Sequence, residues 1–208
     1  MLPDNAFWVH IENRLMQDLG FYFDLGWHHI IAWDALDHLL FVLALSAVYL
    51  PGNWKQVLIL VTAFTIGHSC TLVLSVYDMV RVNDKWVEFL IPCTIIITAG
   101  LNFLERDYKP RSLRLNYFLA LFFGMIHGLG FANAIRFMLA DGQGVGWGLF
   151  GFNIGLEAGQ VVVVFCILLF SFLVVSKAGL KRKWWVWSLS LAALSVAVKM
   201  AVERIPSL

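Results

Sequence analysis

Six long apolar segments are the feature that most constrains how this 208-residue chain can fold. A bilayer core about 30 Å thick is crossed by about 20 residues of helix. The segments run from about His29 to Leu50, Trp54 to Tyr77, Trp86 to Leu104, Leu115 to Met138, Trp147 to Ser176 and Trp184 to Ile205. Hydrophobic residues make up 60% of the chain and charged residues 14%, whereas soluble proteins carry about 25% charged residues. We therefore predict an all-α polytopic membrane protein, built as one bundle of six transmembrane helices.

The residues ahead of the first apolar segment have a different pattern. Phe7, Ile11 and Leu15 recur at near-helical spacing, and charged residues occupy the other faces. This periodicity predicts a short amphipathic helix at the membrane interface, and the alternative is a simple loop that caps the bundle. The predicted organisation is an N-terminal interfacial segment, residues 1–27, followed by a six-helix transmembrane domain, residues 28–208.

Charge excludes one class of partner and predicts an orientation. The formal net charge of +1 leaves no basic excess for neutralising phosphates, which argues against a nucleic-acid partner. Nine Lys and Arg residues lie on the side of the connectors after spans one, three and five, against six on the other side. By the positive-inside rule, both termini should lie outside the cytoplasm.

Ionisable residues recur inside the apolar segments, where each costs about 2.5–3.5 kcal/mol to insert. In the first span, Asp37 lies three residues and His38 four residues after Asp34, which predicts adjoining faces of one helix. The second span contains His68 in "TAFTIGHSCT", and the fourth contains His127 among glycines. Because small residues let helices approach closely, we expect these groups to meet inside the bundle.

The residue types predict a metal site. Two or three imidazoles with one or two carboxylates suit Zn, Ni, Co or Fe(II), whereas the three cysteines have no CxxC spacing that would favour a thiolate site. A structural polar network or a proton relay is the alternative. Glu88, beside Trp86 and Lys85, fits the mouth of a site better than a ligand position. The candidate metal ligands are His29 at the membrane edge, Asp34, Asp37, His38, His68, His127 and Glu157.

Five stretches in order resemble the HupE/UreJ family of bacterial membrane proteins: "DHLLFVLAL", "FTIGHSCTLVLS", "VEFLIPCTIIITAGLNFL", "FFGMIHGLGFA" and "FNIGLEAGQ". The resemblance covers five of the six spans. It implies a secondary permease for nickel or cobalt in the bacterial inner membrane, and the family's Asp-His pair falls on Asp37 and His38.

Two positions depart from the pattern of the nickel permeases in that family. Ile31 stands where those members have a histidine ahead of the Asp-His pair, and Ala132 stands where they have a glutamate downstream of the second histidine motif. Asp34 in the first span and Glu157 on the fifth are the carboxylates that could substitute.

Two further functions remain open on sequence grounds. Zinc with an open coordination position would make a zinc-dependent intramembrane hydrolase, for which no catalytic residue can be assigned. A membrane assembly factor with a structural polar core would need no metal. No Walker loop, GxSxG or HExxH motif occurs, and no cofactor-binding box is apparent. The expected partners are the metal ion and the lipid bilayer, and the sequence is compatible with a homo-oligomer.

Overall fold

The structure is a computed structural model that describes residues 4–105, 112–139 and 145–206. Within these ranges, the side chains of residues 4–15 and of Asp34, Phe137, Leu139 and Val145 are not described.

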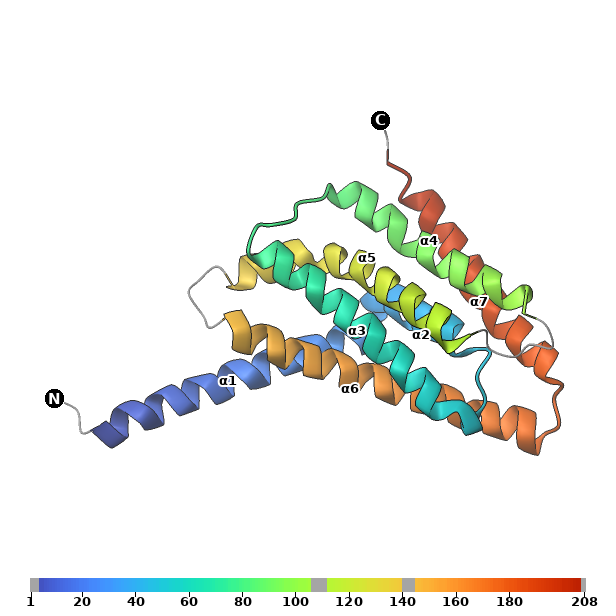
Figure 1. Cartoon of the computed structure of the whole chain (residues 1–208), viewed down its shortest axis with the longest axis horizontal. Coiled ribbons are helices and arrows are strands. Elements are labelled where there is room, and N and C mark those ends of the chain that lie inside the picture. Colours follow the sequence, from blue (N-terminus) through green and yellow to red (C-terminus); the bar gives the residue numbers. More distant parts are fainter. Residues whose placement is uncertain (1–3, 106–111, 140–144, 207–208) are drawn as a thin grey trace.

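Every regular element in the described ranges is helical, which confirms the predicted all-α class (Figure 1). The α-helices are α1 (Asp4–Ile31), α2 (Leu36–Ser46), α3 (Trp54–Val76), α4 (Asp84–Phe103), α5 (Leu113–Leu139), α6 (Val145–Ser171) and α7 (Arg182–Glu203). Short 3-10 turns precede α2 and α3, at η1 (Trp33–Ala35) and η2 (Pro51–Asn53), and a π-helical turn, η4 (Phe172–Lys177), follows α6.

Five helices, α3 to α7, are long and apolar enough to cross a bilayer. The later part of α1 and α2 pass the same test together as a pair bent by 65°, which is either a sixth, broken span or a re-entrant loop. Large apolar side chains remain exposed on the outer faces of α5 and α6, as expected where helices meet lipid tails: Phe118, Phe122, Phe150, Phe165 and Phe170. The chain is therefore a multi-span membrane protein, and six crossings would place its two ends on the same face.

The first span differs from the prediction of one continuous helix. The α-helix ends at Ile31, Ala32 is extended with φ −68° and ψ 151°, and a single 3-10 turn leads into α2 at Leu36. The expectation that Asp34, Asp37 and His38 share one helix is therefore wrong, because Asp34 lies in the turn before that helix. Irregular backbone at membrane depth is tolerated where it lines a cavity, and this break borders the largest cavity described below.

The N-terminal segment is helical, and its place at the membrane interface stays a prediction. It belongs to α1, a 28-residue helix, so the boundary expected between residues 27 and 28 falls inside a helix. The later turns of α1 lie along α6 and not apart from the bundle: a Cβ placed at Gly26 or Gly155 would overlap backbone of the other helix. Close packing against α6 explains why the helix continues past residue 27.

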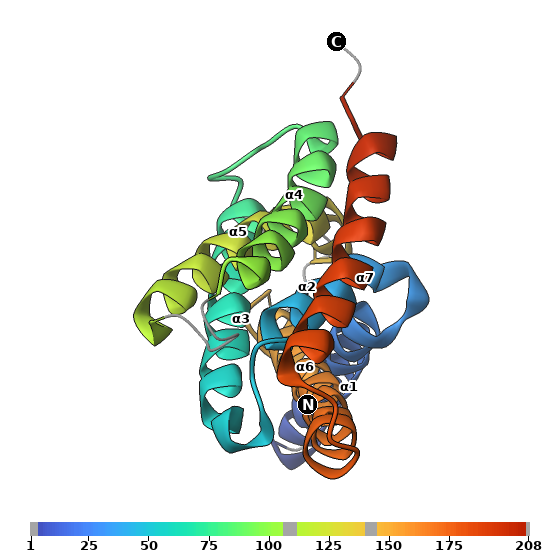
Figure 2. The same cartoon turned by 90° about the vertical axis from the view of Figure 1, so that its right-hand side faces the viewer.

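Helices α3 and α5 form a second pair that packs closely at glycines. A Cβ at Gly67 would overlap the Leu121 carbonyl oxygen, and one at Gly124 would overlap that of Phe64. Only glycine permits this separation, so the small residues fix how closely α3 and α5 approach. Helix α2 is largely buried near the middle of the bundle, where it packs mainly against α4, α6 and α7 (Figure 2).

Candidate metal centre

The break between α1 and α2 brings two histidines face to face. His29 lies in the last turn of α1 and His38 in the first turns of α2. Their ring centroids are 4.6 Å apart, although eight residues separate them in the chain. A continuous helix would have placed them more than two turns apart, so the bent span creates this pair.

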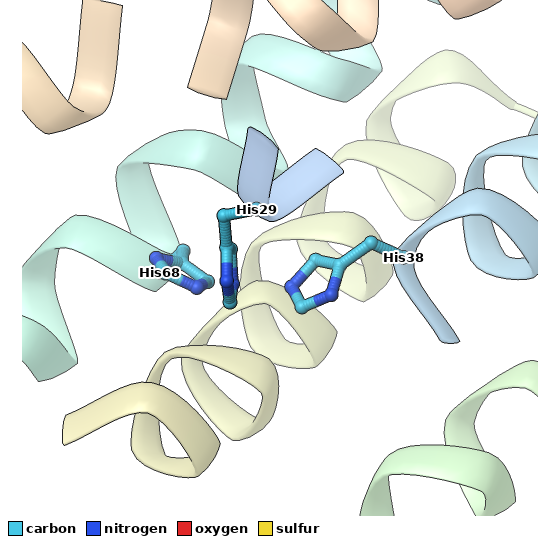
Figure 3. A group of neighbouring side chains, drawn as sticks. All are labelled: His29, His38 and His68. Atoms are coloured by element: carbon cyan, nitrogen blue, oxygen red, sulfur yellow. The ribbon is translucent and has the colours of Figure 1, made fainter. Parts of the chain in front are cut away.

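A third imidazole completes the cluster from α3. One ring nitrogen from each of His29, His38 and His68 lies within 4.8 Å of the other two. Figure 3 shows the His29 ring between the other two rings. Nitrogen ligands about 2.0–2.1 Å from one tetrahedral ion stand about 3.3 Å apart. Shifts of about 1 Å in the side chains would therefore bring this group onto a single ion.

His127 on α5 adjoins this group, with its ring centroid 4.9 Å from that of His38. Thr94 donates its one hydroxyl hydrogen to the Ile91 carbonyl oxygen at 2.7 Å. The 2.9 Å contact between Thr94 Oγ1 and His127 Nε2 is therefore donated by the ring. His127 Nδ1 keeps its lone pair and is buried without a hydrogen-bond partner.

Asp37 orients the central imidazole. Its Oδ1 accepts hydrogen bonds from the His38 backbone N–H at 2.8 Å and from His38 Nδ1 at 2.9 Å. This carboxylate contact places the proton on Nδ1 and leaves the lone pair on Nε2, the arrangement common in histidine ligands of metals. The other oxygen, Oδ2, lies 3.7 Å from the Arg204 guanidinium at the end of α7.

The ring nitrogens of the cluster are its most unusual feature. Within the described protein, five of them are buried and have no hydrogen-bond partner: His29 Nε2, His38 Nε2, His68 Nδ1 and Nε2, and His127 Nδ1. Leaving a buried polar atom unsatisfied costs about 1–3 kcal/mol, and buried groups are rarely left in that state. A shared cation would satisfy one nitrogen of each ring at once, so the residues present fit a metal ion.

The cluster borders a cavity of about 470 Å³. Its polar lining includes His29, Asp37, His38 and His127, together with residues near the start of α4 and the end of α7: Glu88 and Arg204. The cavity therefore lies toward the end of the bundle where α4 begins and α7 ends. Glu88 lines it without belonging to the group of three histidines, as expected for a residue at its mouth.

Aromatic rings form much of the wall around the imidazoles. The Phe131 ring is 4.3 Å from that of His29, the Phe64 ring 5.9 Å from that of His38, and the Phe152 ring stacks on His68 at 6.1 Å. These rings keep the local dielectric low, so a cation at the cluster would interact strongly with its ligands and with Asp37.

Comparison with known proteins gives a match to one family, described as HupE/UreJ protein, over residues 6–204. The chain belongs to the HupE/UreJ family. No curated protein and no solved structure matches it. The family is generally linked to nickel and cobalt transport.

The Asp-His pair to which the family resemblance points, Asp37 and His38, is at the centre of the cluster. Ile31, where the resemblance predicts a histidine, is the last residue of α1, and His29 supplies the third imidazole two residues earlier. Ala132, where the resemblance predicts a glutamate, is buried among apolar side chains. The bend after α1 thus brings His29, and not residue 31, to the cluster.

The structure brings together five of the seven predicted ligands: His29, Asp37, His38, His68 and His127. Glu157 on α6 has a different partner, since its carboxylate accepts a hydrogen bond from Thr62 at 2.6 Å. The side chain of Asp34 lies outside the described residues. Sequence reasoning assigned no role to Arg204 or Thr94, and the available signal for Thr94 was a threonine within an otherwise apolar helix.

Proposed function

We propose that this HupE/UreJ protein is a secondary transporter of a divalent transition-metal ion, nickel or cobalt, and that the ion binds to the imidazoles of His29, His38 and His68. One observation supports the proposal most strongly. Histidines from three helices meet inside a membrane protein, and each of these histidines has a buried ring nitrogen without a hydrogen-bond partner. His127 adjoins the same site and can serve as a fourth ligand.

The donor set favours these ions over the abundant alkaline-earth ions. Imidazole suits nickel, cobalt and zinc, whereas magnesium and calcium prefer oxygen ligands. Asp37 adds one negative charge beside His38 and so offsets part of the charge of a divalent ion. The driving force would come from an ion gradient or the membrane potential, because the sequence has no nucleotide-binding motif.

The location follows from the same proposal. A bacterial metal permease acts in the inner membrane, and the distribution of Lys and Arg favours both termini outside the cytoplasm. With that orientation, the 470 Å³ cavity beside Arg204 opens toward the outside. The ion would thus reach the imidazoles from the external solution.

A zinc-dependent intramembrane hydrolase is the second candidate. Three histidines with an open fourth position also suit a catalytic zinc, which lowers the pKa of its bound water. A transporter must instead bind its ion weakly enough to release it on the other side.

Flux into proteoliposomes distinguishes the two candidates. We expect wild-type protein to carry Ni²⁺ or Co²⁺ inward under an imposed proton gradient or potential. His68→Ala should reduce the flux to the level of empty vesicles, and the lipid-facing control Phe165→Ala should keep it. The hydrolase would replace the transporter if three results occurred together. The protein would hold zinc tightly, it would carry no nickel, cobalt or zinc, and it would cleave a lipid amide or ester.

A further inference from the structure

A stripe of polar residues runs along α4 away from the histidines. Thr94, Thr98 and Asn102 follow one another at intervals of four residues, which places them on one face of the helix. Their exposed fractions are 2%, 8% and 6%, so the stripe is inside the bundle. Glu105 follows three residues after Asn102, just beyond the end of α4.

The first residue of the stripe touches the metal centre. Thr94 Oγ1 lies 2.9 Å from His127 Nε2, and the Thr98 hydroxyl donates to the Thr94 carbonyl oxygen at 2.8 Å. The polar face of α4 therefore begins at the imidazole cluster and continues toward the opposite end of the bundle.

A second, much smaller cavity of about 30 Å³ lies at the far end of the stripe. Thr98, Asn102, Glu105 and Asn116 supply its polar lining. A space this size holds about one water molecule or one ion. It lies where α2 and α4 end and α5 begins, away from the end that holds the histidine cavity.

The groups that line this cavity offer oxygen atoms. The Asn102 amide nitrogen donates to the Ala44 carbonyl oxygen at 2.8 Å and to Ser190 Oγ at 3.0 Å, so both its hydrogens are used elsewhere. The amide oxygen is what Asn102 retains for a ligand. The Thr98 hydroxyl hydrogen is likewise donated to Thr94, which leaves Thr98 Oγ1 as an acceptor. Glu105 adds a carboxylate.

We propose that this small cavity is a second cation site, made of the Thr98, Asn102 and Glu105 oxygens, through which the ion leaves the imidazole cluster. The role of this site in the exit of the ion rests on the proposed transport function. Carboxylate and carbonyl oxygens are the preferred donors of Mg²⁺, Ca²⁺ and Mn²⁺. They hold nickel or cobalt less tightly than imidazoles do, which suits a site from which the ion must depart.

Two phenylalanines separate the sites. The Phe41 ring lies 5.3 Å from that of His127 and 6.1 Å from that of Phe123, and Phe123 lines the small cavity. Phe41 is fully buried, so an ion cannot pass between the sites until these rings move. In the described arrangement, the histidine cluster borders the larger cavity, and the Phe41 ring lies between the cluster and the small cavity.

The test uses full-length protein and two probes, Ni²⁺ for the imidazole cluster and Mn²⁺ for the oxygen site. In wild-type protein, Mn²⁺ paramagnetic resonance should detect a weak site, which Thr98→Val and Glu105→Gln should each weaken at least 10-fold. Both variants should keep Ni²⁺ affinity within about 2-fold and lose at least 90% of Ni²⁺ flux. The exposed control Glu203→Gln should change none of these quantities.

The outcomes separate this site from the transport proposal. If both variants still bind Mn²⁺ as wild-type protein does, the proposal of an oxygen site is overturned, whatever the Ni²⁺ flux is. Loss of Mn²⁺ binding with normal Ni²⁺ flux overturns its place on the route. If wild-type protein carries no metal at all, the transport proposal fails. The oxygen site then stands or falls on whether His68→Ala still binds Mn²⁺ and whether Glu105→Gln in that background removes the binding.

Discussion

Polar side chains meet in two regions of the bundle that differ in how their atoms are satisfied. Between α3 and α6, Thr62 donates to Glu157 at 2.6 Å and Thr65 donates to Gln160 at 2.9 Å. Around His38, five buried imidazole nitrogens have no hydrogen-bond partner in the described protein. Among the four residues of the first region, Gln160 Nε2 is the buried side-chain atom without a hydrogen-bond partner in the described protein.

Whether the buried polar atoms have hydrogen-bond partners distinguishes a contact between helices from a candidate binding site. Polar groups that hydrogen-bond across helices contribute about 0.6 kcal/mol on average and hold the helices together. Unpaired buried nitrogens cost free energy unless a ligand uses them. The α3–α6 hydrogen bonds are therefore typical of a contact that holds helices together, whereas the unpaired nitrogens of the histidines fit the cation site that we propose.

Removing one imidazole should have the largest effect. We expect His68→Ala to weaken Ni²⁺ binding at least 100-fold, because it removes one of three converging ligands. Isothermal titration of purified protein measures the affinity, with Phe165→Ala as the control. An affinity within 3-fold of wild type would put the ion elsewhere.

The carboxylate that orients His38 should have the next largest effect. Asp37→Asn keeps the shape of the side chain but weakens the hold on His38 Nδ1, and loss of such a partner costs about 10–100-fold in metal affinity. The same titration tests this expectation. An unchanged affinity would show that the orientation of His38 does not depend on Asp37.

The α3–α6 contacts should affect stability and not binding. Thr62→Val removes the donor to Glu157, and we expect this to lower the free energy of unfolding by about 1 kcal/mol, since the carboxylate is only partly buried. Glu157→Gln keeps an acceptor and should change stability less. Both variants should bind Ni²⁺ within about 3-fold of wild type. A 10-fold loss in Glu157→Gln alone would make Glu157 a ligand, as the sequence suggested.

The smallest effect is expected at an exposed ion pair in the α3–α4 connection. Arg81 donates to Asp78, and this hydrogen bond holds the pKa of the Asp78 carboxyl below its usual value. The contribution to stability is therefore present above pH about 4 and is lost as pH falls through the lowered pKa. Asp78→Asn should leave Ni²⁺ affinity and the unfolding temperature at neutral pH nearly unchanged, because exposed pairs contribute little. A clear loss of affinity would link this connection to the site.

Sequence reasoning found most of the site because of a simple constraint. Histidines in separate apolar spans must either converge or find other partners, so His38, His68 and His127 could be grouped before their positions were known. Five ordered family stretches gave the same answer for Asp37. The five continuous spans followed from segment length alone, and the sixth predicted span corresponds to the bent pair of α1 and α2.

The break in the first span could not be predicted in the same way. The residues around Ala32 are mostly apolar helix formers, and nothing local indicates the extended backbone that Ala32 adopts. The turns of α1 before the break pack closely against α6, and the break itself sets the position of His29 relative to His38. The approach of Arg204 to Asp37 depends equally on how α7 packs, which the spacing of residues along one helix does not reveal.

The most direct test of the central claim is X-ray absorption at the nickel edge of protein loaded with one equivalent of Ni²⁺. Imidazole rings give a characteristic multiple-scattering pattern, so the spectrum counts the histidines bound to the ion. We predict at least three imidazoles in the first coordination sphere, supplied by His29, His38 and His68. A first sphere of oxygen atoms alone, or one that contains sulfur, would contradict it.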